Sequence, residues 1–351
     1  MDDTDLELLN RFQRDFPLLS RPFRHIAEIL GQTEEVVLAS LHRLWQAGKI
    51  SRIGAVFATK RLGVSTLAAL AVPPTQLETV AAWINEYPEV NHNYQREHTF
   101  NLWFVLTAES TARIQTILAE IREKTGLPLL DLPLLEPFHI DLGFDLQQHE
   151  RRNALSTTTE RAVSAPTILS DADHNLLAAL QPGLPLIKQP YYALGRTLNL
   201  SEQAVLKYLG DWLQQGLIKR LGIIVHHRAL GYRANAMVVW DIPDTEIGTV
   251  GRKLALESGV NLCYRRPRRL PHWRYNLFCM IHGRERDTVL AQIERLRVTQ
   301  NLESYPYSVL FSVRCFRQRG AYYHLTTPVL PNGKATNQQC INHHEIAAWM
   351  S

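Results

Sequence analysis

Residues 260–280, in the second half of the chain, bring together side chains suited to binding anions and flat rings. The stretch reads VNLCYRRPRRLPHWRYNLFCM and holds five arginines beside a histidine and several aromatic residues. Pro267 and Pro271 keep its middle out of regular structure, so we predict a loop held between two strands. Guanidinium groups bind carboxylates or phosphates in a fixed geometry, and aromatic side chains suit an apolar ring. The stretch therefore predicts a site for a planar ligand that carries several acid groups.

The candidate residues of this loop divide into two roles. His272 is a candidate proton donor, because an imidazole titrates near neutral pH. The competing interpretation of the loop is a solvated basic segment without a ligand, and core packing competes with ligand contact for the aromatic rings. The candidate ligand-binding residues are Tyr264, Arg265, Arg266, Arg268, Arg269, Trp273 and Arg274.

The elements around this loop become clear when the chain is compared with itself, because its two halves are similar. A shift of 168 residues superposes Arg52 on Arg220. Further along, after a small insertion and a five-residue excess in the second half, NLW at 101–103 matches NLF at 276–278. A unit of this length is too long for a solenoid repeat. We therefore predict two homologous modules fused in one chain.

By this symmetry, residues 94–99 of the first module take the place of the arginine-rich loop. They supply Tyr94 and Arg96 as candidate ligand contacts and His98 as the second candidate proton donor. Arg52 and Arg220 occupy matched positions and are candidates for holding a carboxylate, with an exposed basic residue as the alternative. A structural role is the alternative for each histidine. Because the two loops differ, we predict one productive pocket built from both modules. The histidines considered outside these two loop tips are His92, His226 and His227.

The totals restrict the class of protein. The 351 residues carry a net charge of +4, and 45% of them are hydrophobic, which is enough for real cores in two or three domains. Every apolar run is shorter than the roughly 18 residues that a membrane span needs. The four cysteines lack CxxC spacing, which predicts neither a disulfide framework nor a metal site. The acidic N-terminus lacks a signal-peptide pattern, so we expect a soluble cytoplasmic protein.

Each module begins with three predicted helices. Thr33 and Ser201 are the predicted N-caps of the third helix, and Gly48 and Gly216 end it. Three helices with a short turn before the third are typical of a winged helix-turn-helix. The predicted wing strands are 50–57 and 217–225.

A helix-turn-helix suggests DNA binding, but the third helix argues against it. Its first turn carries Glu34 and Glu35 in one module and Glu202 in the other, where a recognition helix needs basic and amide side chains. Carboxylates at these positions oppose binding to phosphates. The sequence therefore argues against a DNA-binding role.

The rest of each module has the order βαββαβ, which predicts a ferredoxin-like sandwich. The predicted fold class is α+β, with two tandem modules, each a winged helix-turn-helix followed by a ferredoxin-like domain. The predicted strands are 66–72, 90–94, 100–106 and 129–135 in the first module and 234–240, 260–264, 276–281 and 305–311 in the second. The predicted boundaries are 1–57 and 58–146 for the first pair of domains, 147–168 for a linker, 169–225 and 226–320 for the second pair, and 321–351 for a C-terminal tail.

This architecture resembles that of the Lrp/AsnC transcription regulators. Within that superfamily, IGAVF at 53–57, NYQREHTFNLW at 93–103 and CYRRP at 263–267, which leads to HWRYNL at 272–277, resemble segments of the sirohaem decarboxylases. The tandem form resembles a fusion of two such subunits, of the NirD–NirL type. The resemblance covers nearly the whole chain except the C-terminal tail.

The resemblance implies removal of the two acetate carboxylates on rings C and D of sirohaem. The product is 12,18-didecarboxysirohaem, on the route to haem d1 or, in other organisms, to haem. The resemblance implies no cofactor and no metal site of the protein itself, because the sirohaem iron is part of the substrate. It also implies paired homologous subunits, so we expect such partners or self-association.

The chemistry of this reaction agrees with the candidate residues. A pyrrole acetate loses carbon dioxide only when the electrons left behind have an acceptor, and protonation of the neighbouring ring carbon creates one. The site therefore needs a general acid, for which histidine is suited, and cations that hold the remaining carboxylates. A cation on the departing carboxylate would stabilise the ground state and slow the reaction. We therefore assign His98 and His272 to proton delivery or iron contact and the arginines to the spectator carboxylates.

Two other functions fit parts of the sequence. A transcription regulator that senses a small anionic ligand or a tetrapyrrole fits the helix-turn-helix. A carrier that binds a tetrapyrrole without reacting fits the cationic loop. The mass of the tetrapyrrole after anaerobic incubation with the protein separates an enzyme from both.

Overall fold

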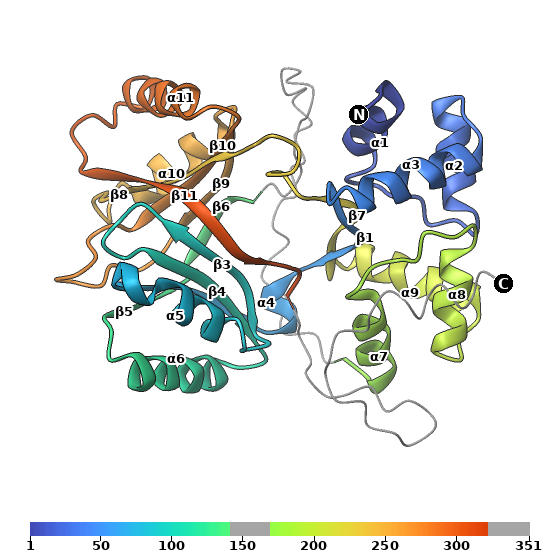
Figure 1. Cartoon of the computed structure of the whole chain (residues 1–351), viewed down its shortest axis with the longest axis horizontal. Coiled ribbons are helices and arrows are strands. Elements are labelled where there is room, and N and C mark those ends of the chain that lie inside the picture. Colours follow the sequence, from blue (N-terminus) through green and yellow to red (C-terminus); the bar gives the residue numbers. More distant parts are fainter. Residues whose placement is uncertain (141–168, 322–351) are drawn as a thin grey trace.

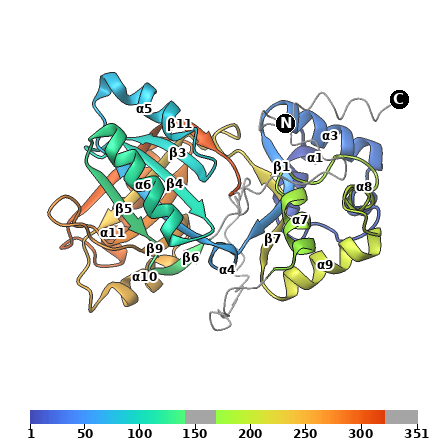
Figure 2. The same ribbon diagram turned by 90° about the horizontal axis from the view of Figure 1, so that it is seen from below.

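The computed structural model describes residues 1–140 and 169–321, and these form two lobes, one of helices and one built on β-sheet (Figure 1, Figure 2). The predicted linker and nearly all of the predicted tail lie outside the described residues. No helix in the described ranges is both long and apolar enough for a membrane span. The expected cytoplasmic location stays a prediction.

The helical lobe contains both helix-turn-helix units, which the sequence predicted. Side-chain caps fix the helix starts, since Thr33 accepts a hydrogen bond from the Val36 amide and Ser201 accepts one from the Ala204 amide. The predicted wing strands are present but pair with each other as a two-stranded antiparallel sheet. The helices are α1 (Asp3–Arg11), α2 (Pro22–Leu30) and α3 (Glu34–Gln46), then α7 (Asp171–Leu180), α8 (Pro190–Thr197) and α9 (Glu202–Gln214), and the strands are β1 (Ile50–Phe57) and β7 (Ile218–Val225).

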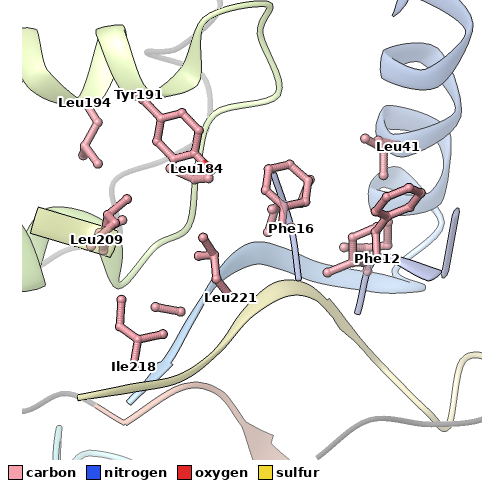
Figure 3. Close-up of a cluster of buried hydrophobic side chains, with 14 of the residues drawn as sticks. Phe12, Phe16, Leu41, Leu184, Tyr191, Leu194, Leu209, Ile218 and Leu221 are labelled. Atoms are coloured by element: carbon pink, nitrogen blue, oxygen red, sulfur yellow. The ribbon is translucent and has the colours of Figure 1, made fainter. Parts of the chain in front are cut away.

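One hydrophobic core serves both helix-turn-helix units. Phe12, Phe16 and Leu41 from the first module and Tyr191 and Leu209 from the second belong to the same buried cluster (Figure 3). Apolar burial is the main favourable term in folding, so the two units stabilise each other.

Backbone bonds also cross between the two units. The segment after α1 lies on the wing of the other module, where the Ile223 amide donates to the Phe12 carbonyl over 2.7 Å. A second bond that crosses between the units runs from the Leu184 amide to the Ile53 carbonyl, also over 2.7 Å. The helical lobe is therefore one unit formed from both modules.

The sheet lobe contains both ferredoxin-like domains, in the predicted order of elements. The strand order is β5-β2-β4-β3-β11-β8-β10-β9-β6. The first module supplies α4 (Thr59–Leu62), β2 (Val64–Leu70), a 3-10 turn η1 (Pro74–Gln76), α5 (Leu77–Ile84), β3 (Val90–Arg96), β4 (Leu102–Ala108), α6 (Thr111–Thr125), β5 (Leu129–Pro133) and β6 (Glu136–Ile140). The second supplies β8 (Ala234–Trp240), α10 (Ile247–Leu256), β9 (Val260–Arg265), β10 (Leu277–Gly283), α11 (Arg286–Thr299) and β11 (Tyr307–Gln318).

The last stretch of strand in each module extends beyond its predicted end and crosses to the other module. In β11, residues up to Phe311 pair with β8, and those from Ser312 onward pair with β3 of the first module. The first module divides the same path into β5, which pairs with β2, and β6, which pairs with β9. Since β5 and β6 end the strand order and only two residues separate them, the sheet curls round on itself.

The curled sheet has three apolar layers. One cluster lies between the first module's strands and α5 and α6, and another between the second module's strands and α10 and α11. These helix pairs cover opposite outer faces of the lobe (Figure 1). A third cluster, with residues such as Trp103, Trp273 and Met237, fills the space between the two sets of strands.

We predict that Gly222→Ala destabilises the chain while Gly54→Ala, at the matched position, does not. A Cβ at Gly222 would overlap the carbonyl oxygen of Gln13, whereas at Gly54 the nearest atom lies 3.4 Å away, in the side chain of Arg52. Overpacking against backbone costs about 1–3 kcal/mol of unfolding free energy. Urea unfolding followed by circular dichroism measures the difference, and equal midpoints for the two variants would contradict the close approach.

Candidate functional site

Two matched tyrosine–arginine pairs mark equivalent positions of the two modules. Arg96 is buried, its guanidinium lies 5.8 Å from the centre of the Tyr94 ring, and its Nη1 donates to the Leu310 carbonyl over 3.0 Å. Arg266 lies 4.7 Å from the Tyr264 ring centre and donates to the Leu132 carbonyl. Each arginine thus bonds to the last sheet segment of the other module.

These two guanidiniums lie in an environment that favours an anion. Burial lowers the pKa of Arg96 to about 10 and also lowers the pKa of Arg266. Within residues 1–140 and 169–321, no carboxylate lies within ion-pair distance of either group. A buried cation without a carboxylate partner carries a desolvation cost that a bound anion would offset.

The two predicted loop tips meet each other in the structure. The ring of His98 meets the ring of Trp273 edge-on, with centroids 5.3 Å apart. Trp273 is only 1% exposed and packs against Trp103, Tyr275 and Phe278, so it is part of the apolar interior.

The two candidate proton donors of these tips differ in their surroundings. His98 accepts a hydrogen bond at Nδ1 from the Phe100 amide over 3.0 Å, which leaves a proton at Nε2 in the neutral ring. Burial lowers the pKa of His98. His272 is exposed. Neither histidine lines the hollow of about 360 Å³ beside His226 or the hollow of about 210 Å³ beside Ser312.

Three arginines of the second loop have carboxylate partners within the chain. Arg268 and Arg274 pair with Asp241 over 2.7 and 2.8 Å, and Arg265 pairs with Asp244 over 3.1 Å. These aspartates follow β8, so the ion pairs fix the loop to the end of that strand. The fourth, Arg269, forms backbone hydrogen bonds with Trp273 in both directions. Three of the five guanidiniums of this loop are therefore held by ion pairs, although two aspartates offset at most two of the five positive charges.

The matched wing arginines lie on the paired strands β1 and β7. Arg52 stands opposite Ile224, and its positive charge, after burial, contributes to lowering the pKa of His226. Arg220 stands opposite Val56, toward the other end of the paired strands. The structure thus brings Arg52, and not Arg220, beside His226.

A hollow of about 360 Å³ lies where the helical lobe meets the sheet lobe. The end of β11 approaches the paired wings here (Figure 1). The charged side chains that line it are all basic or imidazole. The lining consists of Gly48, His226, Arg228, Ala229, Cys315, Phe316, Arg317 and Gln318.

A group of histidines adjoins this hollow. His227 is buried and contacts Asn235 over 3.0 Å, and its ring lies 5.1 Å from that of His282. His92 stacks on Tyr94 with centroids 6.0 Å apart, and Tyr94 pairs across the sheet with Cys315 of the hollow.

Burial sets the charge of this histidine group. It lowers the pKa of His227 to about 4, with a further contribution from the charge of Arg228. Burial alone lowers the pKa of His92 to about 4, and burial followed by the neighbouring charges lowers the pKa of His282 well below its usual value. These imidazoles are therefore neutral at pH 7 in the ligand-free chain.

The histidine group has no counterpart at the matched positions of the other module. Matching β3 with β9 and β4 with β10 puts Leu262 at the position of His92 and Thr107 at that of His282. Thr107 accepts from Asn91 over 2.9 Å, just as His282 contacts Asn261 over 2.9 Å. The scaffold is conserved between modules, and the titratable groups are not.

Sequence reasoning missed Arg228, His282 and Cys315. For His282, the signal was available in the self-comparison. His282 interrupts the apolar end of β10 at a position where the other module has a threonine. A search for positions that are titratable in only one module would have selected it.

We predict that stability falls as pH is lowered from 6.5 to 4, and that His227→Gln reduces the slope. An unfolded imidazole titrates near 6.5, and His227 in the folded chain has a pKa of about 4. In this window the unfolded state binds the extra proton, which costs about 1.4 kcal/mol of stability per pH unit per histidine. Urea midpoints against pH measure the slope, with exposed His272→Gln as the control. A slope unchanged by His227→Gln would refute the burial argument.

The comparisons with known proteins identify the family. The model "Siroheme decarboxylase NirDL-like HTH domain" matches residues 5–50 and 173–219, and "AsnC-like ligand binding domain" matches 61–139 and 229–317. The "Siroheme decarboxylase NirDL subunit" of Paracoccus denitrificans is 44% identical over 92% of this chain and 97% of its own. The "Siroheme decarboxylase" of Hydrogenobacter thermophilus is 30% identical over 89% and 92%.

A solved structure agrees with these relatives. A crystal structure of the siroheme decarboxylase NirDL in co-complex with an iron-uroporphyrin III analogue matches with a TM-score of 0.67 and 27% identity, over 92% of this chain and 94% of that one. The matches span both modules of the chain described here and nearly the full length of these relatives. With both helix-turn-helix units and both AsnC-like domains in place, the chain belongs to the sirohaem decarboxylase NirDL family.

Proposed function

We propose that this chain is a carboxy-lyase that removes the acetate carboxylates on rings C and D of sirohaem, giving 12,18-didecarboxysirohaem for haem d1 synthesis. The observation that carries the proposal is the one-sided grouping of neutral imidazoles and guanidiniums where the lobes meet. His226 and Arg228 line the hollow, and His227, His282 and Arg96 lie around it. Family membership supports the same substrate.

The reaction needs a proton for each carboxylate lost. The ring-bound acetate takes up one proton and becomes a methyl group and carbon dioxide. Protonation of the ring carbon beside the acetate provides the acceptor for the electron pair of the breaking carbon–carbon bond. General acid catalysis of this kind contributes about 10² to 10⁴ in rate. Every group that the step needs is a proton donor or a cation of the protein, with sirohaem and its iron as substrate.

The histidine group suits this acid role. Burial and nearby positive charge hold the pKa of His227 at about 4 in the ligand-free chain. An entering polyanion adds negative charge beside the imidazole, which raises its pKa and allows it to collect a proton. We therefore assign proton delivery to His226 and His227, and treat His98 and His272, the donors predicted from the sequence, as the alternative.

Other groups around the hollow suit the carboxylates that remain. Arg96 and Arg228 supply positive charge, and the oxygen of Ser312 accepts from Arg228 Nη1 over 3.1 Å. Burial raises the pKa of Tyr94, so its phenol keeps its proton and can donate to an acid group. Cations on spectator carboxylates orient the ring without stabilising the carboxylate that leaves.

The fused chain supplies both members of a subunit pair. The "Siroheme decarboxylase NirD subunit" of Stutzerimonas stutzeri is 55% identical over 42% of this chain, and its NirL counterpart is 50% identical over 41%. Separate subunits thus correspond to halves of this chain. We infer that one chain here replaces such a pair, with self-association as a further expectation.

A regulator that binds DNA is less well supported. The first turns of α3 and α9 contact the opposite helix-turn-helix unit, through an ion pair of Glu35 with Lys188 at 2.9 Å and a hydrogen bond from Ser20 to Glu202 at 2.8 Å. In a DNA-binding helix-turn-helix, residues at this end of the recognition helix contact the bases in the major groove. These contacts and their carboxylates support our expectation that the chain does not bind DNA.

We predict that His227→Gln slows decarboxylation at least about 100-fold, the loss expected for a general acid, while most sirohaem binding remains. The matched variant His98→Gln is expected to stay within about threefold of the unchanged chain, since His98 lies at the loop tips. Anaerobic incubation with sirohaem and mass spectrometry of the tetrapyrrole measure the loss of carbon dioxide. The reverse ranking of the two variants would assign the acid to the loop tips instead.

We predict that Arg96→Gln weakens binding of ferric uroporphyrin about tenfold or more, whereas Arg266→Gln leaves it nearly unchanged. Both variants lose an equivalent hydrogen bond to a carbonyl of the other module. Both should therefore lose a similar stability, of about 1–3 kcal/mol. Only Arg96 lies beside the histidine group. Absorption titration measures the affinity and urea unfolding the stability. Equal losses of affinity would mean that the site is not one-sided.

A further inference from the structure

A second hollow lies next to the first, connected to it through Arg228. Arg228 lines the first hollow, and its Nη1 donates to the hydroxyl of Ser312, which lines the second. The second hollow measures about 210 Å³. Its lining consists of Glu97, Arg233, Ala234, Arg284, Arg286, Phe311 and Ser312.

The charge in this hollow is strongly positive. Arg286 forms a bidentate pair with Glu97, at 2.7 and 2.6 Å, which neutralises one of the three guanidiniums. Arg233 and Arg284 have no carboxylate within ion-pair distance in the part of the chain that the structure describes. Arg284 instead lies 5.5 Å from the centre of the Tyr232 ring. Two exposed guanidiniums therefore face a hollow that holds no compensating charge for them.

The other module does not repeat this feature. Matching β4 with β10 places Glu109 at the position of Arg284 and Thr111 at that of Arg286. The sign of the charge is thus reversed at the turn between strand and helix. The cationic hollow and the histidine group lie near each other, and neither is repeated at the matched positions of the other module. A general requirement for solubility would not place both features together.

We propose that Arg233 and Arg284 form a carboxylate subsite for acid groups that the reaction leaves in place, and that this subsite selects macrocycles with eight carboxylates over those with four. The inference rests on the proposed function and extends it to substrate selection. A macrocycle whose reacting edge lies at the histidine group carries further acid groups on its periphery. Arg228 lines the first hollow and donates to Ser312 of the second, so the two hollows are neighbours, and acid groups of a ligand at the first are near enough to enter the second. Guanidinium groups are well suited to carboxylates at such a position.

The test uses the full chain with the double variant Arg233→Gln and Arg284→Gln. The matched control is the double variant Arg122→Gln and Arg252→Gln, which removes the same total charge. These two arginines are exposed and lie on the outer helices α6 and α10. The probes are ferric uroporphyrin, with eight carboxylates, and ferric coproporphyrin, with four. Absorption titrations at low and high salt give the affinities, and circular dichroism checks the fold.

We expect the double variant to bind the eight-carboxylate probe about tenfold more weakly, the size expected for two partly exposed ion pairs. Its affinity for the four-carboxylate probe should change less than about twofold, and its salt dependence should decrease. The control should match the unchanged chain. Equal losses in the control, or equal losses for both probes, would overturn the subsite.

The experiments can distinguish a failure of the subsite from a failure of the proposed function. If the unchanged chain removes carbon dioxide from sirohaem and the double variant still binds the eight-carboxylate probe with full affinity, the subsite is wrong and the proposed function stands. If the unchanged chain leaves the mass of sirohaem unaltered, the proposed function fails, and the subsite fails with it.

Discussion

The exchange of terminal strands between the two modules is the constraint on which the rest of the structure depends. The second half of β11 pairs with β3, and β6 pairs with β9, so a strand segment of the other module extends the four-stranded sheet of each ferredoxin-like domain. The helical lobe also contains a strand pairing that crosses between modules, since β1 pairs with β7. Main-chain hydrogen bonds that cross between modules cannot be lost singly without leaving buried polar groups unpaired. The two halves are therefore bound to a single arrangement.

This arrangement explains why titratable side chains can differ between two halves of the same fold. Arg96 and Arg266 each bond to a carbonyl of the other module, and this pair of contacts is symmetric. Around that symmetric frame, one side has His92 and His282 where the other has Leu262 and Thr107. Because the frame is held by the backbone and by these two arginines, side chains around it can change without altering the fold. One side can thus carry the chemistry while the other supports it.

The fold could largely be predicted from the sequence, because its signals are local. Caps such as Thr33 and Ser201, apolar periodicity and the repeat predicted the two winged helix-turn-helix units and both βαββαβ domains. The crossing of β11 could not be predicted, since a period-two pattern gives the face of a strand but not its neighbour. The ion pairs of Arg265, Arg268 and Arg274 could not be predicted from the sequence either. Their partners, Asp241 and Asp244, are more than twenty residues away in sequence and become neighbours only in the folded sheet.

The contrast between the two loop tips and the histidine group shows why residue type alone is a weak guide to a site. The arginine-rich loop has the strongest composition signal in the chain, yet its guanidiniums are mostly paired and its tryptophan is core. The histidine group has a weak signal, being scattered over β3, β10 and the turn after β7. What distinguishes it is an energetic cost. Burial first, and then the charges of Arg96 and Arg228, keep these imidazoles neutral, so the folded chain loses stability in acid. An anion that enters would favour their protonated form. A group of side chains that is unfavourable without a ligand is stronger evidence for a site than a group that is already satisfied.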